Sequence, residues 1–151
     1  MTDKGRKTLK IVLLSIIGLT VASFFVHSLM PRELSVAESD GVASILSSLI
    51  YADTPLGAFI INNLRKIAHF SEYGVLGIEL AIYVEMLAPC RKRGVIASFL
   101  FAHATAFIDE SLQIISGRGP SIADVWLDMS GFAALFAASL LIAFLIRKIK
   151  K

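Results

Sequence analysis

The stretch DESLQIISGRGPSIADVWLDMSG, residues 109–131, decides the fold class because it joins two apolar segments of helical length through a short polar turn. Its SGRGP run predicts the turn, and Ser121 with Asp124 three residues later resembles a capping box at the start of a helix. Four acidic side chains and Arg118 lie within the stretch. Charged groups inside a membrane span cost about 2.5–3.5 kcal/mol each on insertion scales, so we expect these groups to pair, line a cavity or do chemistry.

The composition of the whole chain is that of a membrane protein. Of its 151 residues, 56% are hydrophobic and the mean hydropathy is +0.73, whereas soluble domains contain about 45–50% apolar residues. The net charge of +3 does not indicate nucleic-acid binding, because lysines and arginines gather at the chain ends and in one short loop, as membrane anchors do. The single cysteine, Cys90, excludes an internal disulfide. We therefore predict an all-α polytopic protein with a single membrane domain over residues 1–151.

Four apolar segments are long enough to cross a bilayer, since a crossing helix needs about 20 residues. They are residues 10–30, 66–88, 94–115 and 122–146. The first segment resembles the start of a secreted chain, but Val26-His27-Ser28 is a poor cleavage site, so we expect the segment to remain as a span. The pattern predicts a four-transmembrane-helix bundle.

A long outer loop, residues 31–65, is predicted between the first two spans, and it should contain short amphipathic helices. Ser39 and Asp40 are expected to cap the first of these helices, and Thr54 followed by Pro55 is typical of a second helix start. The first helix would present one apolar stripe made of Val42, Ile45, Leu46, Leu49 and Ile50. Such a helix lies in the membrane interface or covers the mouth of the bundle, either as a solvated lid or as a gate for a substrate.

The distribution of basic residues predicts the orientation. Eleven of the fifteen lysines and arginines lie at the N-terminus, in the Arg91–Arg93 loop and at the C-terminus, and four lie on the other side. The positive-inside rule then places both termini in the cytoplasm. The polar stretch that joins the last two spans falls at the outer face.

Polar side chains of the second span are predicted to face the interior of the bundle. His69, Glu72 and Glu79 share one helical face because their spacings are close to whole turns. Lys66 and Tyr73 lie along the same side. A stripe of ionisable groups is too costly to expose to lipid.

The third span brings further polar groups to the same outer end. His103, Glu110 and Gln113 share a face, whereas Asp109 points about 100° away from Glu110 on a helix. We therefore expect Asp109 to have a different partner from Glu110. His103 and Glu79 lie near mid-depth, where they could extend the polar pocket inward as a proton path.

In the fourth span, Asp124 has a structural interpretation as a helix cap. Asp128, one turn later, lies too deep to cap the helix and needs a partner. Arg118 is the first candidate for that partner, and His69 or Lys66 is the next. These groups converge from three spans, which predicts a polar pocket open to the outside or to the outer leaflet.

Short motifs occur along the chain in a fixed order. They are KIAHFSEYG at residues 66–74, ESLQ at 110–113, GR at 117–118 and SIAD at 121–124, followed by Gly131. In order and spacing they resemble the VanZ-like family, with Asp128 where that family often has asparagine and Asp109 as an added acid. The resemblance covers Pro55 to Leu145. It implies a multi-pass protein of the bacterial cytoplasmic membrane linked to low-level resistance to glycopeptides such as teicoplanin, and it supplies no reaction.

We favour a non-enzymatic pocket that binds a lipid-linked cell-wall intermediate, a lipoglycopeptide or another anionic envelope component. Its ligand-binding residues would be Lys66, His69, Tyr73, Glu110, Gln113, Arg118, Asp124 and Asp128. Arginine suits this task because its guanidinium group can contact phosphate with two hydrogen bonds. No cofactor is needed for such binding.

Two other functions remain open. In a membrane-embedded hydrolase or transferase acting on a lipid-linked phosphate, His69 with Glu72 or Glu110 would serve as general base and orienting group, and the same groups could hold a divalent metal ion. The sequence lacks a recognised nucleophile or metalloprotease motif, which disfavours an enzyme. In a purely structural interpretation, the polar groups pair among themselves and specify helix packing.

Overall fold

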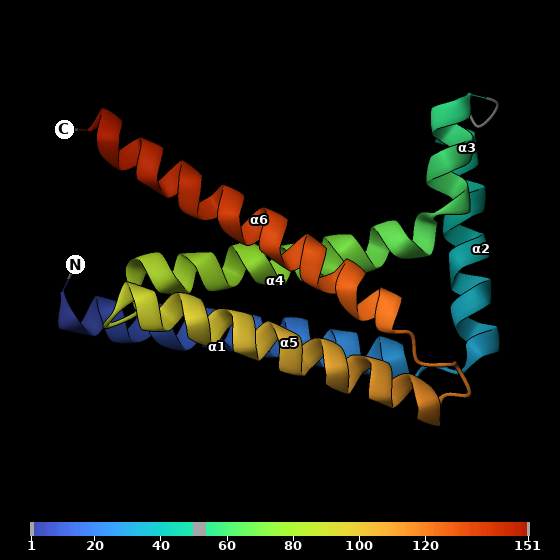
Figure 1. Cartoon of the computed structure of the whole chain (residues 1–151), viewed down its shortest axis with the longest axis horizontal. Coiled ribbons are helices and arrows are strands. Elements are labelled where there is room, and N and C mark those ends of the chain that lie inside the picture. Colours follow the sequence, from blue (N-terminus) through green and yellow to red (C-terminus); the bar gives the residue numbers. More distant parts are fainter. Residues whose placement is uncertain (1, 50–53, 151) are drawn as a thin grey trace.

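The computed structural model describes residues 2–49 and 54–150, and this part of the chain is helical without any strand. Its six helices are α1 (Asp3–Leu29), α2 (Arg32–Leu49), α3 (Pro55–Asn62), α4 (Leu64–Met86), α5 (Arg91–Ile115) and α6 (Ile122–Ile149) (Figure 1). The all-α prediction is confirmed. The first helix begins earlier than expected because the Thr2 hydroxyl caps it, accepting a hydrogen bond of 3.2 Å from the Gly5 amide.

The long helices α1, α4 and α5 run side by side, α6 crosses α4 at an angle, and α2 and α3 stand across one end of them (Figure 1). Both termini and the turn between α4 and α5 lie at the opposite end. The most extensive contact joins α4 to α6. The polar connection between α5 and α6 therefore shares an end of the molecule with α2 and α3.

By length and composition, three of the described helices are candidate membrane spans: α1, α5 and α6. The fourth long helix, α4, has 23 residues, but it carries Arg65, Lys66 and three glutamates. These charges lower its hydropathy, although its residues contact the other three long helices. The sequence-based count of four spans is thus supported for three helices.

The region predicted as a loop forms a longer first helix than expected. Ser39 and Asp40 do not cap it, because α2 begins at Arg32, where the Pro31 carbonyl oxygen accepts a hydrogen bond of 3.1 Å from the Ser35 amide. The Ser39 hydroxyl instead donates to the Ser35 carbonyl oxygen within the helix. No residue of α2 is buried, and most of its large apolar side chains are exposed in the described structure. Ile50, expected on the same stripe, lies outside the described residues.

The second helix of this region starts as predicted. The Thr54 hydroxyl accepts a hydrogen bond of 3.1 Å from the Gly57 amide, and Pro55 occupies the first turn. Proline loses no hydrogen bond there, because the first amides of a helix have no partner within it. Asn63 ends α3 and directly precedes α4.

Glycines allow α4 and α6 to approach each other closely. A Cβ atom on Gly77 would lie 2.6 Å from the Phe132 carbonyl oxygen, and one on Gly131 would collide with the backbone of Phe70. Small residues at such positions let helix backbones meet within a membrane. The contact at Gly131 is close to the polar end of the bundle, so it fixes the distance between polar side chains there.

The opposite end is held by a charged group. Glu85 of α4 accepts a hydrogen bond of 2.8 Å from Arg91 and lies 2.5 Å from a guanidinium nitrogen of Arg147. One carboxylate thereby connects the end of α4 to the start of α5 and the end of α6. Between the two ends, the core is apolar and includes the stacked rings of Phe132 and Phe136.

Candidate functional site

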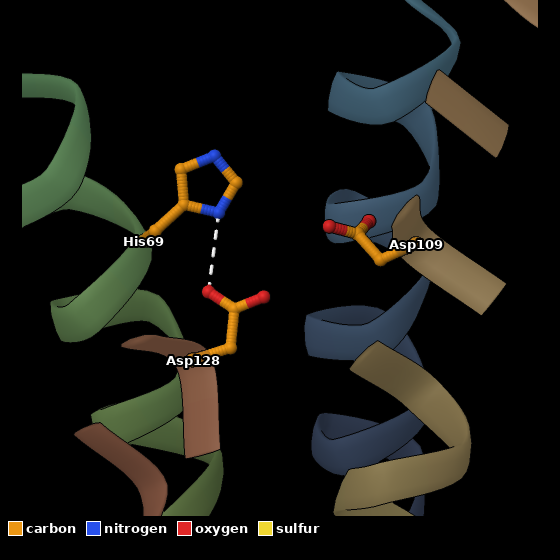
Figure 2. Close-up of side chains that lie close together, drawn as sticks. All are labelled: His69, Asp109 and Asp128. Carbon is orange, nitrogen blue, oxygen red and sulfur yellow. Dashed lines mark hydrogen bonds and ion pairs between the residues drawn. The ribbon is translucent and has the colours of Figure 1, made fainter. Parts of the chain in front are cut away.

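Three ionisable side chains from three helices meet near the end covered by α2. His69 of α4, Asp109 of α5 and Asp128 of α6 each offer a nitrogen or oxygen atom, and these atoms lie within 4.8 Å of one another (Figure 2). Asp128 is fully buried and Asp109 is 2% exposed. The His69 Nδ1 atom lies 3.2 Å from Oδ1 of Asp128. We call these three residues the His–Asp cluster.

Local sequence explains why His69 and Asp128 meet. His69 directly precedes Phe70, whose carbonyl oxygen faces Gly131 of α6. Asp128 lies three residues before Gly131, which places it on the same side of α6, almost one turn nearer the polar end. The close helix contact that Gly131 permits therefore brings the imidazole and the carboxylate into hydrogen-bond range.

Asp109 and Glu110 have different partners, as predicted from their angular separation. Asp109 Oδ1 accepts a hydrogen bond of 2.5 Å from the Ser28 hydroxyl of α1. Glu110 accepts bonds of 2.6 Å from the Gln113 amide group and 2.7 Å from the Ser121 backbone amide. Glu110 thus holds the start of α6 against the end of α5, whereas Asp109 faces α1.

Arg118 does not pair with Asp128, and this first-choice prediction was wrong. Its guanidinium group donates to backbone carbonyl oxygens at the end of α1, including His27 and, at 2.9 Å, Met30, and to the Ser35 hydroxyl at 3.2 Å. Arg118 therefore satisfies carbonyl groups that a helix end leaves without partners. Burial and the nearby charge of Arg65 lower the pKa of Arg118, but an arginine stays protonated in proteins.

The His–Asp cluster borders a cavity of about 180 Å³, the main cavity, which lies between α1, α2 and α4. Its polar lining includes the side chains of Arg65, His69, Glu72 and Asp109. His27 of α1 contacts the other two helices: one ring nitrogen lies 3.5 Å from Glu38 of α2 and the other 3.5 Å from Glu72 of α4. A second cavity of about 230 Å³, the side cavity, is lined by Asn62, Asn63, Arg65, Lys66, His69, Asp124 and Leu127. Arg65 and His69 line both cavities, so the two hollows are neighbours.

The structure separates the residues predicted for ligand binding into two groups. His69, Lys66 and Asp124 line one or both cavities, as does Glu72, which was predicted only as a candidate catalytic residue. Glu110, Gln113, Arg118 and Asp128 are engaged in hydrogen bonds within the protein, and among these only Arg118 also lines a cavity. Their part in ligand binding remains a prediction.

Tyr73 is fully buried one turn beyond His69 along α4, and its ring stacks on Phe24 with the ring centres 4.9 Å apart. Its hydroxyl group has no hydrogen-bond partner. Two residues of the site were not among the predicted ligand-binding residues: Arg65, which lines both cavities, and Asp109. Two features of the sequence could have identified them: Arg65 directly precedes Lys66, and Asp109 points about 100° away from Glu110 on a helix.

Apolar helices of spanning length and a buried polar cluster at one end define a small all-helical membrane protein. The chain belongs to the VanZ/LLP1 family, whose model matches residues 11–146. This match confirms the family resemblance seen in the motifs. Comparisons with curated proteins and with solved structures found no match.

Proposed function

We propose that α4 is a fourth membrane span and that both termini lie in the cytoplasm of a bacterial cell. Twenty-three helical residues extend about 34 Å at 1.5 Å each, enough for a hydrocarbon core of about 30 Å. Glu79 turns toward α1, where the Thr20 hydroxyl donates to it at 2.8 Å, so this charge need not face lipid. An even number of spans agrees with termini at one end of the bundle (Figure 1).

Cys90 offers a direct test of this orientation because it is exposed in the turn between α4 and α5. In intact cells it should resist a membrane-impermeant maleimide and react after permeabilisation. A Cys90→Ser, Ser116→Cys variant should show the opposite behaviour, since residue 116 lies between α5 and α6 at the other end. Labelling of Cys90 in intact cells would contradict the orientation.

We propose that the outer polar end binds a phosphate-bearing, lipid-linked component of the cell envelope. The supporting observation is the position of Arg65, an exposed guanidinium group that lines both cavities and makes a hydrogen bond of 3.2 Å to Gln113. Lys66 and the Asn63 amide add donors beside the side cavity. Arginine contacts phosphate with two parallel hydrogen bonds, and lysine adds a compact positive charge.

The apolar part of the main cavity fits the lipid part of such a ligand. Phe24, Val42, Leu64 and Ala68 line it beside the charged groups. Ligand pockets commonly combine apolar walls with a few polar groups that fix orientation. We propose that binding of this component underlies low-level resistance to glycopeptides such as teicoplanin.

A susceptibility assay tests this function. A host lacking the gene would express wild type, Arg65→Gln or the control Arg93→Gln at equal membrane levels, and teicoplanin susceptibility would be measured. Arg93 is an exposed arginine at the opposite end of the bundle, so the control removes the same charge away from the site. Protection by wild type and the control, and its loss in Arg65→Gln, is expected. Full protection by Arg65→Gln would contradict the proposal.

One observation favours a second candidate, a hydrolase or transferase acting on a lipid-linked phosphate. Asp128 holds Nδ1 of His69, and Nε2 points away from Asp128 (Figure 2). A carboxylate that orients an imidazole while its other nitrogen stays available is the arrangement of a general base. Turnover of a polyprenyl diphosphate by purified protein, lost in His69→Gln, would favour this candidate over binding alone.

A further inference from the structure

The His–Asp cluster places two buried carboxyl groups beside one imidazole. Asp109 and Asp128 are almost completely buried, and the remaining member, His69, is neutral unless protonated. Among the described residues, neither Arg65 nor Arg118 donates a hydrogen bond to a carboxylate of the cluster: Arg118 donates to carbonyl groups of α1, and Arg65 donates to Gln113. Burying ionised carboxylates without a paired cation is costly, so a cation bound between them would stabilise the cluster.

A second observation points to a missing partner. The Asp128 side chain is inaccessible to solvent, and its Oδ2 atom has no hydrogen-bond partner. In Figure 2 this oxygen points toward Asp109, into the space between the two carboxylates. The Tyr73 hydroxyl, one turn along α4 from His69, is also buried without a partner. Buried oxygens without a hydrogen-bond partner are rare, and a bound ion or water is one way to satisfy them.

We propose that His69, Asp109 and Asp128 bind a divalent transition-metal ion such as Zn²⁺ or Mn²⁺. One imidazole nitrogen and carboxylate oxygens suit these ions, because imidazole favours zinc and carboxylates favour manganese. Ligands about 2.0–2.2 Å from a common ion lie at most about 4.4 Å apart. The present separation of up to 4.8 Å needs only a small side-chain adjustment.

The position of the cluster provides both access and open coordination sites. His69 and Asp109 line the main cavity, so an ion can enter from that side, while Asp128 lies behind them. Three protein ligands leave one or more positions for water or a bound oxygen atom. Ser28 holds Asp109 through its hydroxyl group, which fixes the orientation of one ligand. Arg65 and Lys66 are not ligands, so the metal site is independent of the proposed phosphate binding.

Metal titration of the full chain tests this inference. Purified protein in detergent would be stripped with a chelator and titrated with Zn²⁺, Mn²⁺ or Mg²⁺ by calorimetry, and bound metal would be counted by mass spectrometry. We expect about one transition-metal ion per chain and weaker binding of Mg²⁺. Cobalt substitution should produce visible absorption bands that report on an imidazole and oxygen ligand set.

Variants locate the ion. Asp128→Asn and Asp109→Asn remove one charge each with little change in shape, and we expect at least about tenfold weaker binding because each loses a ligand. Asp3→Asn is the matched control: it makes the same substitution at an exposed aspartate in the first turn of α1, outside the cluster and both cavities. Circular dichroism would verify that each variant is folded. Absence of stoichiometric binding to wild type, equal binding by all variants, or tighter binding of Mg²⁺ would overturn the inference.

Discussion

Replacing Gly131 with alanine tests how the contact between α4 and α6 positions His69 and Asp128. The added Cβ would lie 2.8 Å from the Phe70 carbonyl carbon and 3.0 Å from its Cα, whereas ordinary contact begins at 3.4 Å. The Phe70 carbonyl oxygen is closer still, so the helices must separate locally by more than about 0.6 Å, and the obstructing atoms are backbone, which cannot rotate away. Overpacking costs about 1–3 kcal/mol, and the better helix propensity of alanine returns about 1 kcal/mol.

The cost of overpacking minus the gain in helix propensity is at most about 2 kcal/mol. We expect Gly131→Ala to lower the free energy of unfolding by about that amount, because the obstructing atoms are backbone. Titration of purified protein with sodium dodecyl sulfate in mixed micelles measures that quantity. Gly18→Ala is the control, because a Cβ there meets nothing within 4 Å. The control should be neutral or slightly stabilising. Equal stability of the two variants would refute the argument that Gly131 sets this contact.

Three further changes test individual contacts by the same unfolding measurement. Thr20→Val removes the hydrogen bond to Glu79 and should cost about 1–3 kcal/mol, because a buried carboxyl group then has no donor; no loss would mean that this bond contributes nothing. Glu85→Gln should cost about 1 kcal/mol by weakening the ion pair with Arg147, and the difference from wild type should shrink in high salt, since the arginine is half exposed. Tyr73→Phe should change the stability of the metal-free protein by less than about 0.5 kcal/mol, because the hydroxyl has no partner; a large loss would reveal an interaction at that oxygen.

The elements of the fold that depend on local sequence could be predicted. Ser121 caps α6 by accepting a hydrogen bond from the Asp124 amide, and Gly117 adopts a positive φ of 73° in the predicted turn. The different partners of Asp109 and Glu110 followed from the 100° between consecutive helical residues. Each of these features is decided within a few residues of the chain.

Features that depend on distant segments could not be predicted in the same way. Arg118 reaches the end of α1, and its partners are backbone carbonyl groups that have no signature in the sequence. The early start of α2 was missed because Ser39 and Asp40 are good capping residues that a longer helix overrode. His69 was only a second candidate partner of Asp128, and the structure confirms it; the choice depends on the crossing of α4 and α6, which the glycine pattern alone does not determine.

The structure also refines the structural interpretation of the polar residues. Glu110 and Gln113 are bonded to each other and to neighbouring groups, which accounts for their burial without a ligand. The same explanation fails for Asp128, whose second oxygen has no partner. Hydrogen bonds within the protein thus account for the buried polar groups of Glu110 and Gln113, but they leave one oxygen of the His–Asp cluster without a partner.

We propose above that the outer end of this protein recognises phosphate on a lipid. The decisive measurement is the binding of a polyprenyl phosphate to purified protein in nanodiscs, compared with the uncharged polyprenol and with phosphatidylglycerol. We expect wild type to bind the polyprenyl phosphate and not the polyprenol, with at least about tenfold weaker binding by Arg65→Gln because a bidentate phosphate contact is lost, and unchanged binding by Arg93→Gln. Equal binding of phosphate and alcohol, or equal binding by Arg65→Gln and wild type, would contradict the claim.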